Sequence, residues 1–346
     1  MGVGCAAGNV GARAGRRLPK NLSQDPLGRC RCRCHVREGS RHAAALARSR
    51  GLTDVTKGGA AGSRRRVKTV IAPTPGGSPF GVNLESIVAG ANPPPTRHRP
   101  DEYVVNYVMR GEGVLDCGAS NADGVPLRLS CGDFFVIAPG LDHSIACTSN
   151  NARSLDVLSV SVPLGNDREF AHGEWDDRTP VTNAMLSMEE EGCLIGLRRR
   201  KMDELATFQL SDDGAPAGAP SNRIAPVFDP FRDCTPFTCS VEVLDPRYAI
   251  PSHTHDTAFE LFIILSGCGE LVLEAKTVAG RQGAVFLVPP KTVHSVRNAS
   301  DEASMYLLSL ILPNEGFAQK VFNGQYSGKL EGRDLDELKA SSPSSP

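Results

Sequence analysis

The chain contains the same strand-rich pattern twice, about 150 residues apart, and this repeat constrains its fold more than any other feature. Residues 94–115, PPTRHRPDEYVVNYVMRGEGVL, match residues 250–271, IPSHTHDTAFELFIILSGCGEL. Further along each copy, a glycine stands eleven residues before a histidine, His143 in the first copy and His294 in the second. An internal repeat of this length predicts two domains that share one fold.

Short apolar runs separated by turn-forming residues predict that both copies are all-β. From residue 79 to residue 163, β-branched and aromatic runs such as YVVNYVM, FFVIAP and LDVLSVSV alternate with Gly, Asn, Asp and Pro. This pattern is typical of successive antiparallel strands. The run MYLLSLILP, residues 305–313, corresponds to LDVLSVSVP, residues 155–163.

Three histidines and one glutamate in the second copy predict a mononuclear metal site. His253 and His255 are two residues apart, so both rings leave the same face of an extended strand. Glu260 follows after a turn, and His294 begins a later strand. Three imidazoles and a carboxylate suit Fe(II), which we expect first, and also Mn, Ni, Co or Zn, with coordination positions left open. The alternative is that the two histidines are exposed loop residues and Glu260 a surface charge.

The spacing His-x-His-x4-Glu-x6-Gly, followed by Gly-x5-Pro-x-Lys-x2-His-x3-Asn, resembles the paired motifs of the cupin superfamily. The resemblance covers roughly residues 236 to 313. It departs at Arg247 and Lys291, where the family pattern has glycines in turns. Together with the repeat, it implies a bicupin: an all-β chain of two tandem jelly-roll barrels with a few short helices and disordered termini. Cupins with this ligand set include dioxygenases, decarboxylases, isomerases and lyases.

The first copy lacks most of the ligand residues. An ungapped alignment places Arg97, Arg99 and Val104 where the second copy has its first two histidines and its glutamate, and only His143 is retained. A guanidinium cannot be deprotonated to coordinate a cation, so we expect the first barrel to hold no metal.

The two arginines of the first copy have two interpretations. They could form an anion-binding pocket with His143, or they could be solvated rim residues that pair with Asp101 or Glu102. A shift of the strand by one residue would instead bring His98 and Glu102 into a partial metal site, but it would also turn the apolar face of the strand outward.

Composition along the chain predicts five segments. These are a disordered or transit-peptide-like tail over 1–66, a metal-free barrel over 67–163, a helical and Pro/Gly-rich linker over 164–231, a metal-binding barrel over 232–325, and a disordered tail over 326–346. Within the linker, TNAMLSMEEEG and LRRRKMDELATF are expected to be helical. A short helix is also expected around residues 317–322.

The amino-terminal tail and the cysteines bear on localisation. The tail is basic and poor in acids, which is typical of an organelle transit peptide, of a disordered extension or of a wrongly assigned gene start. Eleven cysteines at scattered positions favour a reducing intracellular compartment, either the cytoplasm or an organelle. No run of eighteen apolar residues predicts a membrane span, and the balanced charge gives little support to nucleic-acid binding. A small-molecule substrate is the expected partner, and the chain could also form a homodimer.

The expected surroundings of the metal favour an oxidoreductase. Phe262 and Ile264 share the face of Glu260 and would give the substrate pocket an apolar lining. The sequence identifies no second Glu, Lys or Tyr as a general base, so the catalytic group would be the metal centre itself. These features favour a metal-dependent dioxygenase of a small organic acid or aromatic compound. The alternatives are a non-enzymatic sensor, binding or storage cupin with a structural metal, and a sugar isomerase, which would need a base.

Overall fold

The computed structural model describes residues 65–73, 77–90, 102–118, 125–148, 154–163, 197–210, 221–274 and 276–340. Four two-residue strands are placed by their backbone alone: β1 (Ser23–Gln24), β2 (Cys30–Arg31), β3 (Thr53–Asp54) and β6 (Thr96–Arg97). Among residues 1–36, the structure describes only β1 and β2, which pair antiparallel. Residues 37–346 form one compact unit, which holds all the elements below.

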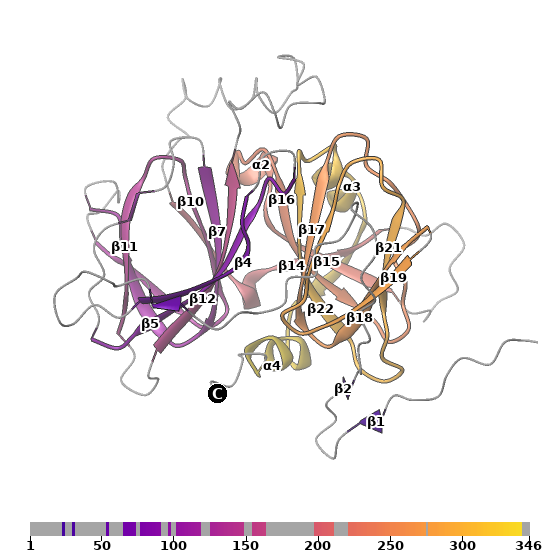
Figure 1. Cartoon of the computed structure of the whole chain (residues 1–346), viewed down its shortest axis with the longest axis horizontal. Helices are drawn as coiled ribbons and strands as arrows, with labels where there is room; N and C mark the ends of the chain where they lie inside the picture. Colours follow the sequence, from indigo (N-terminus) through magenta and orange to yellow (C-terminus); the bar gives the residue numbers. More distant parts are fainter. Residues whose placement is uncertain are drawn as a thin grey trace, which may run out of the picture. The chain divides into compact units, whose positions relative to one another are not determined.

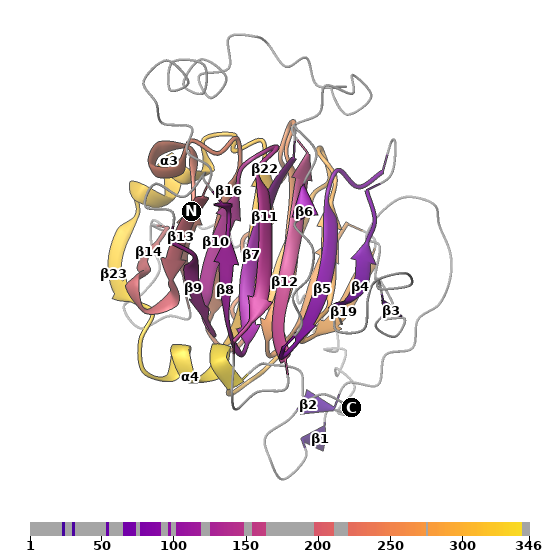
Figure 2. The same ribbon diagram turned by 90° about the vertical axis from the view of Figure 1, so that its left-hand side faces the viewer.

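The first barrel consists of a large and a small sheet. Its further strands are β4 (Arg65–Ile71), β5 (Gly81–Val88), β7 (Glu102–Arg110), β8 (Glu112–Asp116), β9 (Leu127–Ser130), β10 (Asp133–Ile137), β11 (Asp142–Cys147), β12 (Ser154–Pro163) and β13 (Leu197–Lys201). The large sheet has the order β13-β10-β7-β12-β5-β4-β3, and Figure 2 shows the strands from β13 to β4 in this sequence. The small sheet has the order β6-β11-β8-β9.

The second barrel repeats this arrangement. Its strands are β14 (Ala206–Gln209), β15 (Asn222–Phe228), β16 (Thr238–Leu244), β17 (Phe259–Ser266), β18 (Cys268–Leu273), β19 (Lys276–Arg281), β20 (Val285–Val288), β21 (His294–Asn298), β22 (Met305–Leu312) and β23 (Gln325–Lys329). The large sheet, β20-β17-β22-β16-β15-β14-β23, faces a small sheet of β19-β18-β21. The order β20-β17-β22-β16 matches β10-β7-β12-β5, so the structure confirms the duplication (Figure 1).

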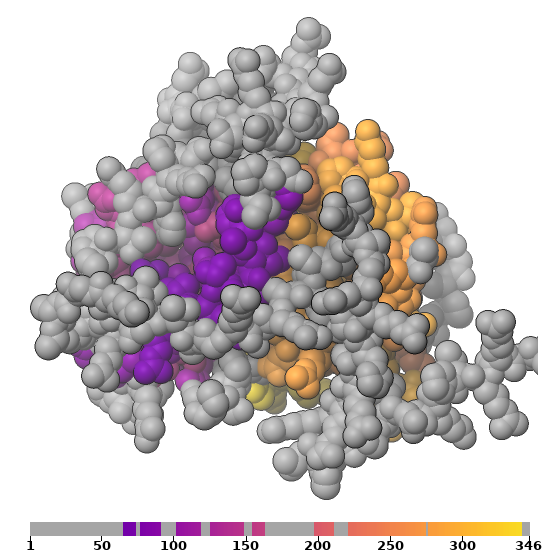
Figure 3. Space-filling model, in the orientation of Figure 1, coloured from indigo at the N-terminus to yellow at the C-terminus, as the bar shows by residue number. Residues whose placement is uncertain are grey.

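Alternation along the strands builds three apolar clusters. One fills the first barrel around Phe135 and Val157, and a second fills the second barrel around Phe262 and Leu307. The third takes the opposite faces of both large sheets, from Tyr107 in β7 to Val241 in β16, so the barrels share a core. In the space-filling view, the indigo residues around β4 border the orange strands of the second barrel (Figure 3). The all-β prediction is thus confirmed, and no helix of the described residues is long and apolar enough to cross a membrane.

The expectation of a helix over LRRRKMDELATF is wrong. Leu197–Lys201 forms β13 and pairs with β10, Met202–Glu204 makes one turn of 3₁₀ helix, and Ala206–Gln209 forms β14 and pairs with β15 and β23. The segment has helix-forming residues, but the two barrels offer it open sheet edges, and backbone pairing there outweighs its propensity. The other expected helix, TNAMLSMEEEG, lies outside the described residues. Residues 222–228, expected in the linker, form β15.

The expectation of a disordered tail over 326–346 is also wrong for residues 326–340. The expected short helix is present as α3 (Phe317–Phe322), and after it the chain continues into β23 and α4 (Arg333–Ala340). A further helix, α2 (Pro230–Asp233), lies between β15 and β16. Asp334 in α4 accepts hydrogen bonds from the Nη1 and Nη2 atoms of Arg223, at 2.8 and 2.9 Å, and from the Tyr306 hydroxyl at 3.0 Å. Leu338 is 1% exposed in the shared core. These contacts involve distant residues, which is why composition alone missed them.

Replacing Leu338 with alanine should lower the free energy of unfolding by about 2–4 kcal/mol, because it leaves a cavity in the core that both barrels share. Urea denaturation followed by circular dichroism measures this. Asp336→Ala, at an exposed position of the same helix, is the control and should change stability by less than about 0.5 kcal/mol. Equal effects of the two substitutions would show that α4 does not pack on the barrels.

Candidate metal centre

Backbone pairing at the end of the second barrel positions the four predicted ligands. His253 and His294 form an isolated antiparallel bridge, with N–H to carbonyl bonds of 3.0 and 2.9 Å. The carbonyl of His255 accepts from the Lys291 amide. Glu260 lies on β17 opposite Val288 of β20. A loop, a strand and the start of another strand therefore converge at one place.

The side chains of these residues form a tight cluster. One ligand atom from each of the four lies within 4.8 Å of those of the others. Glu260 Oε2 lies 2.7 Å from the Nε2 of His294, 3.2 Å from that of His255 and 3.6 Å from that of His253. In the described part of the chain, no other group of three or more His, Cys, Asp or Glu residues has such geometry. The structure thus brings all four predicted ligands together.

The cluster holds a buried negative charge against its imidazoles. Burial would raise the pKa of Glu260, but hydrogen bonds from the three histidines outweigh it and hold that pKa far below its usual range. The hydrogen bond with Glu260 raises the pKa of His255. For His253, burial lowers the pKa, but the contact with Glu260 outweighs it, so that this pKa is raised as well. A divalent cation would replace the protons that the histidines share with Glu260. The cation would therefore bind more tightly as the pH rises.

The orientation of the three imidazole rings fits a metal ion. The Nδ1 atoms of His253 and His294 contact the backbone carbonyls of Pro251 and Thr292 at 2.8 and 2.9 Å, so their Nε2 atoms face the centre. The Nε2 of His255 is buried and also faces the centre, where its contact is Glu260 Oε2 at 3.2 Å. Metal-ligating histidines usually donate their other ring N–H to a carbonyl or a carboxylate in this way. The four residues could therefore hold a divalent transition metal.

Glu315, which sequence reasoning missed, supports the cluster from outside. Its carboxylate accepts hydrogen bonds from the amide and hydroxyl of Thr257 and, at 2.8 Å, from the Ala258 amide. Its other oxygen lies 3.2 Å from His255 Nδ1. Glu315 thus fixes both the ring of His255 and the loop before β17. Its separation from His255 by sixty residues explains why no local motif indicated it.

Phe262 and Ile264, which are predicted to line the substrate pocket, point into the second barrel. Phe262 and Ile264 are 0% and 1% exposed and belong to the cluster inside the second barrel. The ring centroid of Phe262 lies 6.2 Å from that of His294. Side chains next to the ligands on β17 therefore exclude water from the base of the site.

A second carboxyl, which the sequence analysis did not identify, lies inside the second barrel. Glu242 lies on β16, is 2% exposed, and interacts electrostatically with Glu260 and His253. Burial raises its pKa, although hydrogen bonds from Ser309 and Asn222 oppose the shift. The sequence signal was a lone acid within the apolar strand TCSVEVL, which position alone could not distinguish from a solvent-facing residue.

In the first barrel, the pairing corrects the ungapped alignment by one residue. Thr96, and not Arg97, lies opposite His143, whereas His253 lies opposite His294. Val104 does take the place of Glu260, because it pairs with β10 and β12 as Glu260 pairs with β20 and β22. The side chains of Arg97 and Arg99 lie outside the described residues, so the anion pocket stays a prediction.

The turns that lack the family glycines keep a glycine-like backbone. Arg247 and Lys291 have φ angles of 66° and 61°, in the left-handed region that glycine adopts at little cost. The guanidinium of Arg247 donates a hydrogen bond to Asp301, and its backbone amide donates one to the carbonyl of Ser300. The backbone amide of Lys291 donates a hydrogen bond to the carbonyl of His255. The two departures therefore leave the ligand geometry intact.

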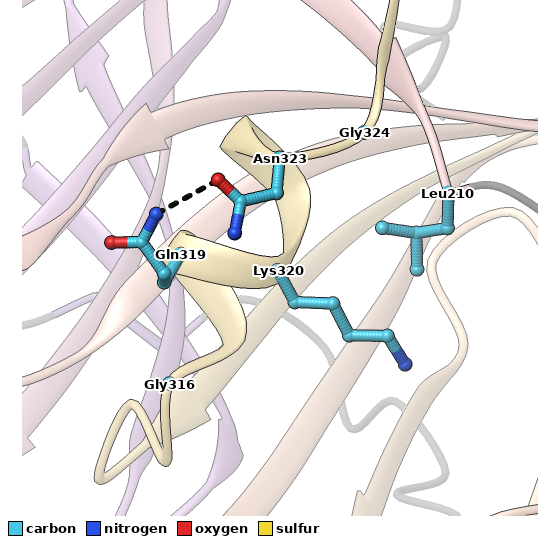
Figure 4. A pocket seen from close by; sticks show the side chains of 6 residues that line it. All are labelled: Leu210, Gly316, Gln319, Lys320, Asn323 and Gly324. Carbon is cyan, nitrogen blue, oxygen red and sulfur yellow. Dashed lines mark hydrogen bonds between the residues drawn. The ribbon is translucent and has the colours of Figure 1, made fainter.

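A pocket of about 410 Å³ lies beside α3, and none of the four ligands lines it. Figure 4 shows its lining residues, which are Leu210, Gly316, Gln319, Lys320, Asn323 and Gly324. Gln319 donates a hydrogen bond to Asn323, and Lys320 extends towards Leu210. With one cation and two amides, this pocket lacks an acid–base pair, and we assign it no chemistry.

Comparison with protein families places one match on each barrel. Residues 240–311 match the model of the cupin domain, and residues 91–176 match that of the AraC-like ligand-binding domain. The chain has the two-barrel fold of a bicupin. A search of curated protein sequences finds no match for it.

Solved structures resemble this bicupin along most of its length. A putative glyoxylate-induced protein from Pseudomonas aeruginosa is 12% identical, with a TM-score of 0.55, and the match covers 81% of this chain and 92% of that one. The oxalate decarboxylase of Lactobacillus farciminis, in a formate complex, is 14% identical, with a TM-score of 0.51 and coverages of 80% and 88%. The Mn(II)-containing oxalate decarboxylase of Bacillus subtilis is 15% identical, with a TM-score of 0.50 and coverages of 81% and 79%. At these identities the likeness shows the fold.

His255→Ala should reduce bound divalent metal to below about a tenth of an equivalent after dialysis against a chelator, because it removes one of the four ligands that converge on the ion. Elemental analysis of the dialysed protein measures this. His143→Ala, which removes the corresponding late histidine of the first barrel, should leave the metal content unchanged. Retention of metal by the His255 variant would refute the ligand assignment.

Glu315→Ala should weaken metal binding about 10–100-fold, because His255 loses the carboxylate that orients its ring. A competition titration with a chromophoric chelator gives the affinity. Glu302→Ala, at an exposed position, is the control. An affinity equal to that of the wild type would show that Glu315 serves only the loop.

Proposed function

We propose that the second barrel is the active site of a metal-dependent enzyme that acts on a small organic acid, with dioxygenation at Fe(II) as its reaction. The observation that carries this proposal is the convergence of three imidazoles and one carboxylate on a common point inside the barrel. Four ligands of this type leave open positions on a divalent transition metal. The same four ligands would fill a tetrahedral site, so the metal proposed here is one that accepts more than four ligands, such as Fe(II) or Mn(II).

The residues of this chain have distinct tasks in such a reaction. His253, His255 and His294 would hold the ion together with Glu260, whose negative charge lowers the net charge of the centre. When bound, the metal supplies a Lewis acid at which a chelating acid and dioxygen can meet. Phe262 and Ile264 keep the inner side of the site apolar. The exclusion of water there strengthens electrostatic interactions with a bound carboxylate.

The solved relatives support a small acid as the substrate and suggest a second reaction. Two are named as oxalate decarboxylases, one in complex with formate and one with Mn(II) centres, and a third is named as glyoxylate-induced. Decarboxylation at Mn(II) is therefore the second candidate reaction. It needs a proton for the product, and Glu242 is a buried carboxyl on the same inner face.

A non-enzymatic sensor is a further candidate, because the first barrel matches an AraC-like ligand-binding domain. The apolar Val104 at the place of Glu260 suits a barrel that binds a ligand without metal. In this case, the second barrel would bind an acid and leave it unchanged.

Anaerobic loading of the full chain with Fe(II) should give oxygen uptake with at least one member of a panel of keto acids and aromatic acids. Glu260→Ala should lower this rate by at least about 100-fold, because the metal is lost. An oxygen electrode and chromatography of the products provide the readout. Release of CO₂ by the Mn(II)-loaded chain without oxygen consumption would favour decarboxylation. Binding of an acid without turnover under any metal would favour the sensor.

A further inference from the structure

Four polar side chains form a cluster on the inner face of the second barrel. We call Asn222, Ser240, Glu242 and Ser309 the inner polar cluster. Ser240, Glu242 and Ser309 are 1%, 2% and 1% exposed. Asn222 Nδ2 donates to Glu242 Oε2 at 2.8 Å, and the Ser309 hydroxyl also hydrogen-bonds Glu242. Most side chains around this cluster are apolar, so its position inside the barrel needs a cause.

The inner polar cluster lies next to the metal ligands. Ser309 on β22 pairs with Phe262 of β17 on one side and with Ser240 of β16 on the other. Glu260 precedes Phe262 by two residues, so all these side chains share the inner face. The electrostatic interactions of Glu242 with Glu260 and His253 also place the cluster and the ligands in one interior.

Two atoms of the cluster have no hydrogen-bond partner. These are the Oγ of Ser240 and the Oδ1 of Asn222, and both are buried. A buried polar atom without a partner costs about 1–3 kcal/mol, so such atoms usually meet a water molecule or a ligand. The hydroxyl of Ser240 is available inside the barrel to a molecule that reaches the metal.

The equivalent acid of the first barrel is neutralised, whereas Glu242 is not. In the first barrel β5 pairs with β12, as β16 pairs with β22 in the second. This pairing places Glu85 of β5 where Glu242 stands in β16. Glu85 forms an ion pair with Arg65, with N–O distances of 2.9 and 2.6 Å. In the second barrel, Asn222 takes the place of Arg65 and brings no charge. Glu242 therefore keeps hydrogen-bonding capacity that Glu85 uses for Arg65.

The equivalent serine has also changed its partner. In the first barrel, the Ser159 hydroxyl donates to Asn106 Oδ1 at 2.8 Å. In the second barrel, the place of Asn106 is taken by Phe262, so Ser309 turns to Glu242 instead. Ser309 in the second barrel thus supports Glu242, whereas Ser159 in the first barrel supports Asn106.

We propose that the inner polar cluster binds an O–H or N–H donor of the substrate, so that this bicupin acts on organic acids that carry a hydroxyl or amino group at the end opposite the metal-binding carboxylate. The proposal rests on the proposed function, because it takes the carboxylate to be held at the metal. Glu242 and Asn222 Oδ1 accept from the donor, and Ser240 supplies the third contact. A second carboxylate at that end brings no hydrogen to the acceptor Asn222 Oδ1 and would have to be buried there as a charge, so dicarboxylates bind worse.

The test uses the Mn(II)-loaded full chain and four acids of equal length: butyrate, 4-hydroxybutyrate, 4-aminobutyrate and succinate. Calorimetry gives the dissociation constant of each. The hydroxy or amino acid should bind at least about tenfold more tightly than butyrate, and succinate more weakly, because a hydrogen bond to a charged group contributes most of this difference. The hydroxyl and amino arms show which donor is preferred. The same comparison with three-carbon acids covers a shorter distance.

Three variants locate the preference. Ser240→Ala and Glu242→Gln should each reduce the preference for the donor-bearing acid about tenfold. Asn222→Arg, which copies Arg65 of the first barrel, should abolish it and lift the discrimination against succinate. Ser240→Ala should leave the unfolding temperature unchanged or raise it, since its hydroxyl has no partner to lose. Ser300→Ala, in a turn of the same barrel, is the control, because it loses bonds from two backbone amides but should retain the full preference.

The outcomes separate the two proposals. If all four acids bind, but the donor-bearing acids show no preference, the inner polar cluster is not the recognition site, and the metal-dependent acid site stands. If Ser240→Ala destabilises the chain and leaves the preference intact, the hydroxyl serves a bound water, and the inference is overturned. If no acid binds to the metal-loaded chain at either length, the proposed function fails, and this inference fails with it.

Discussion

The contact of one buried carboxylate with three imidazoles determines the geometry of the second barrel. Glu260 is 4% exposed, and it could not remain ionised there without the histidines around it. The histidines in turn are held by backbone pairing, since the bridge between His253 and His294 joins the loop before β17 to the start of β21. A negative charge, three ring nitrogens and a closed barrel end therefore depend on one another.

The two barrels show how one backbone supports different interiors. The central strands of their large sheets have the same order and register. Yet Glu260 in the second barrel stands where the first has Val104, and Asn222 stands where the first has Arg65. The first interior satisfies its polar groups internally, through Arg65 with Glu85 and Ser159 with Asn106. The second leaves the hydroxyl of Ser240 and the Oδ1 of Asn222 without a hydrogen-bond partner. The differences arise from single residues at positions that the fold keeps fixed.

Sequence reasoning predicted the parts of this structure that depend on local spacing. The duplication, the all-β fold, the ligand quartet and the inward face of Phe262 follow from periodicities of two and from motif spacing. It could not predict contacts between distant residues, such as Glu315 with His255 or Asp334 with Arg223. The strand over Leu197–Lys201 was mistaken for a helix because its partner, β10, is more than fifty residues away. Glu242 was missed because a residue in a strand reveals its alternation but not which side is the interior.

The shared core explains how a barrel without the metal-ligand quartet can persist. Tyr103 of the first barrel meets the ring of Phe237 in the second, Tyr107 donates a hydrogen bond to the carbonyl of Leu338, and Arg200 pairs with Asp233. Selection on a chain of this kind acts on the first copy through its outer wall, which the second copy needs as a scaffold. The interior of the first barrel is packed separately from this shared wall, so its inner residues can change while the contacts between the barrels are kept.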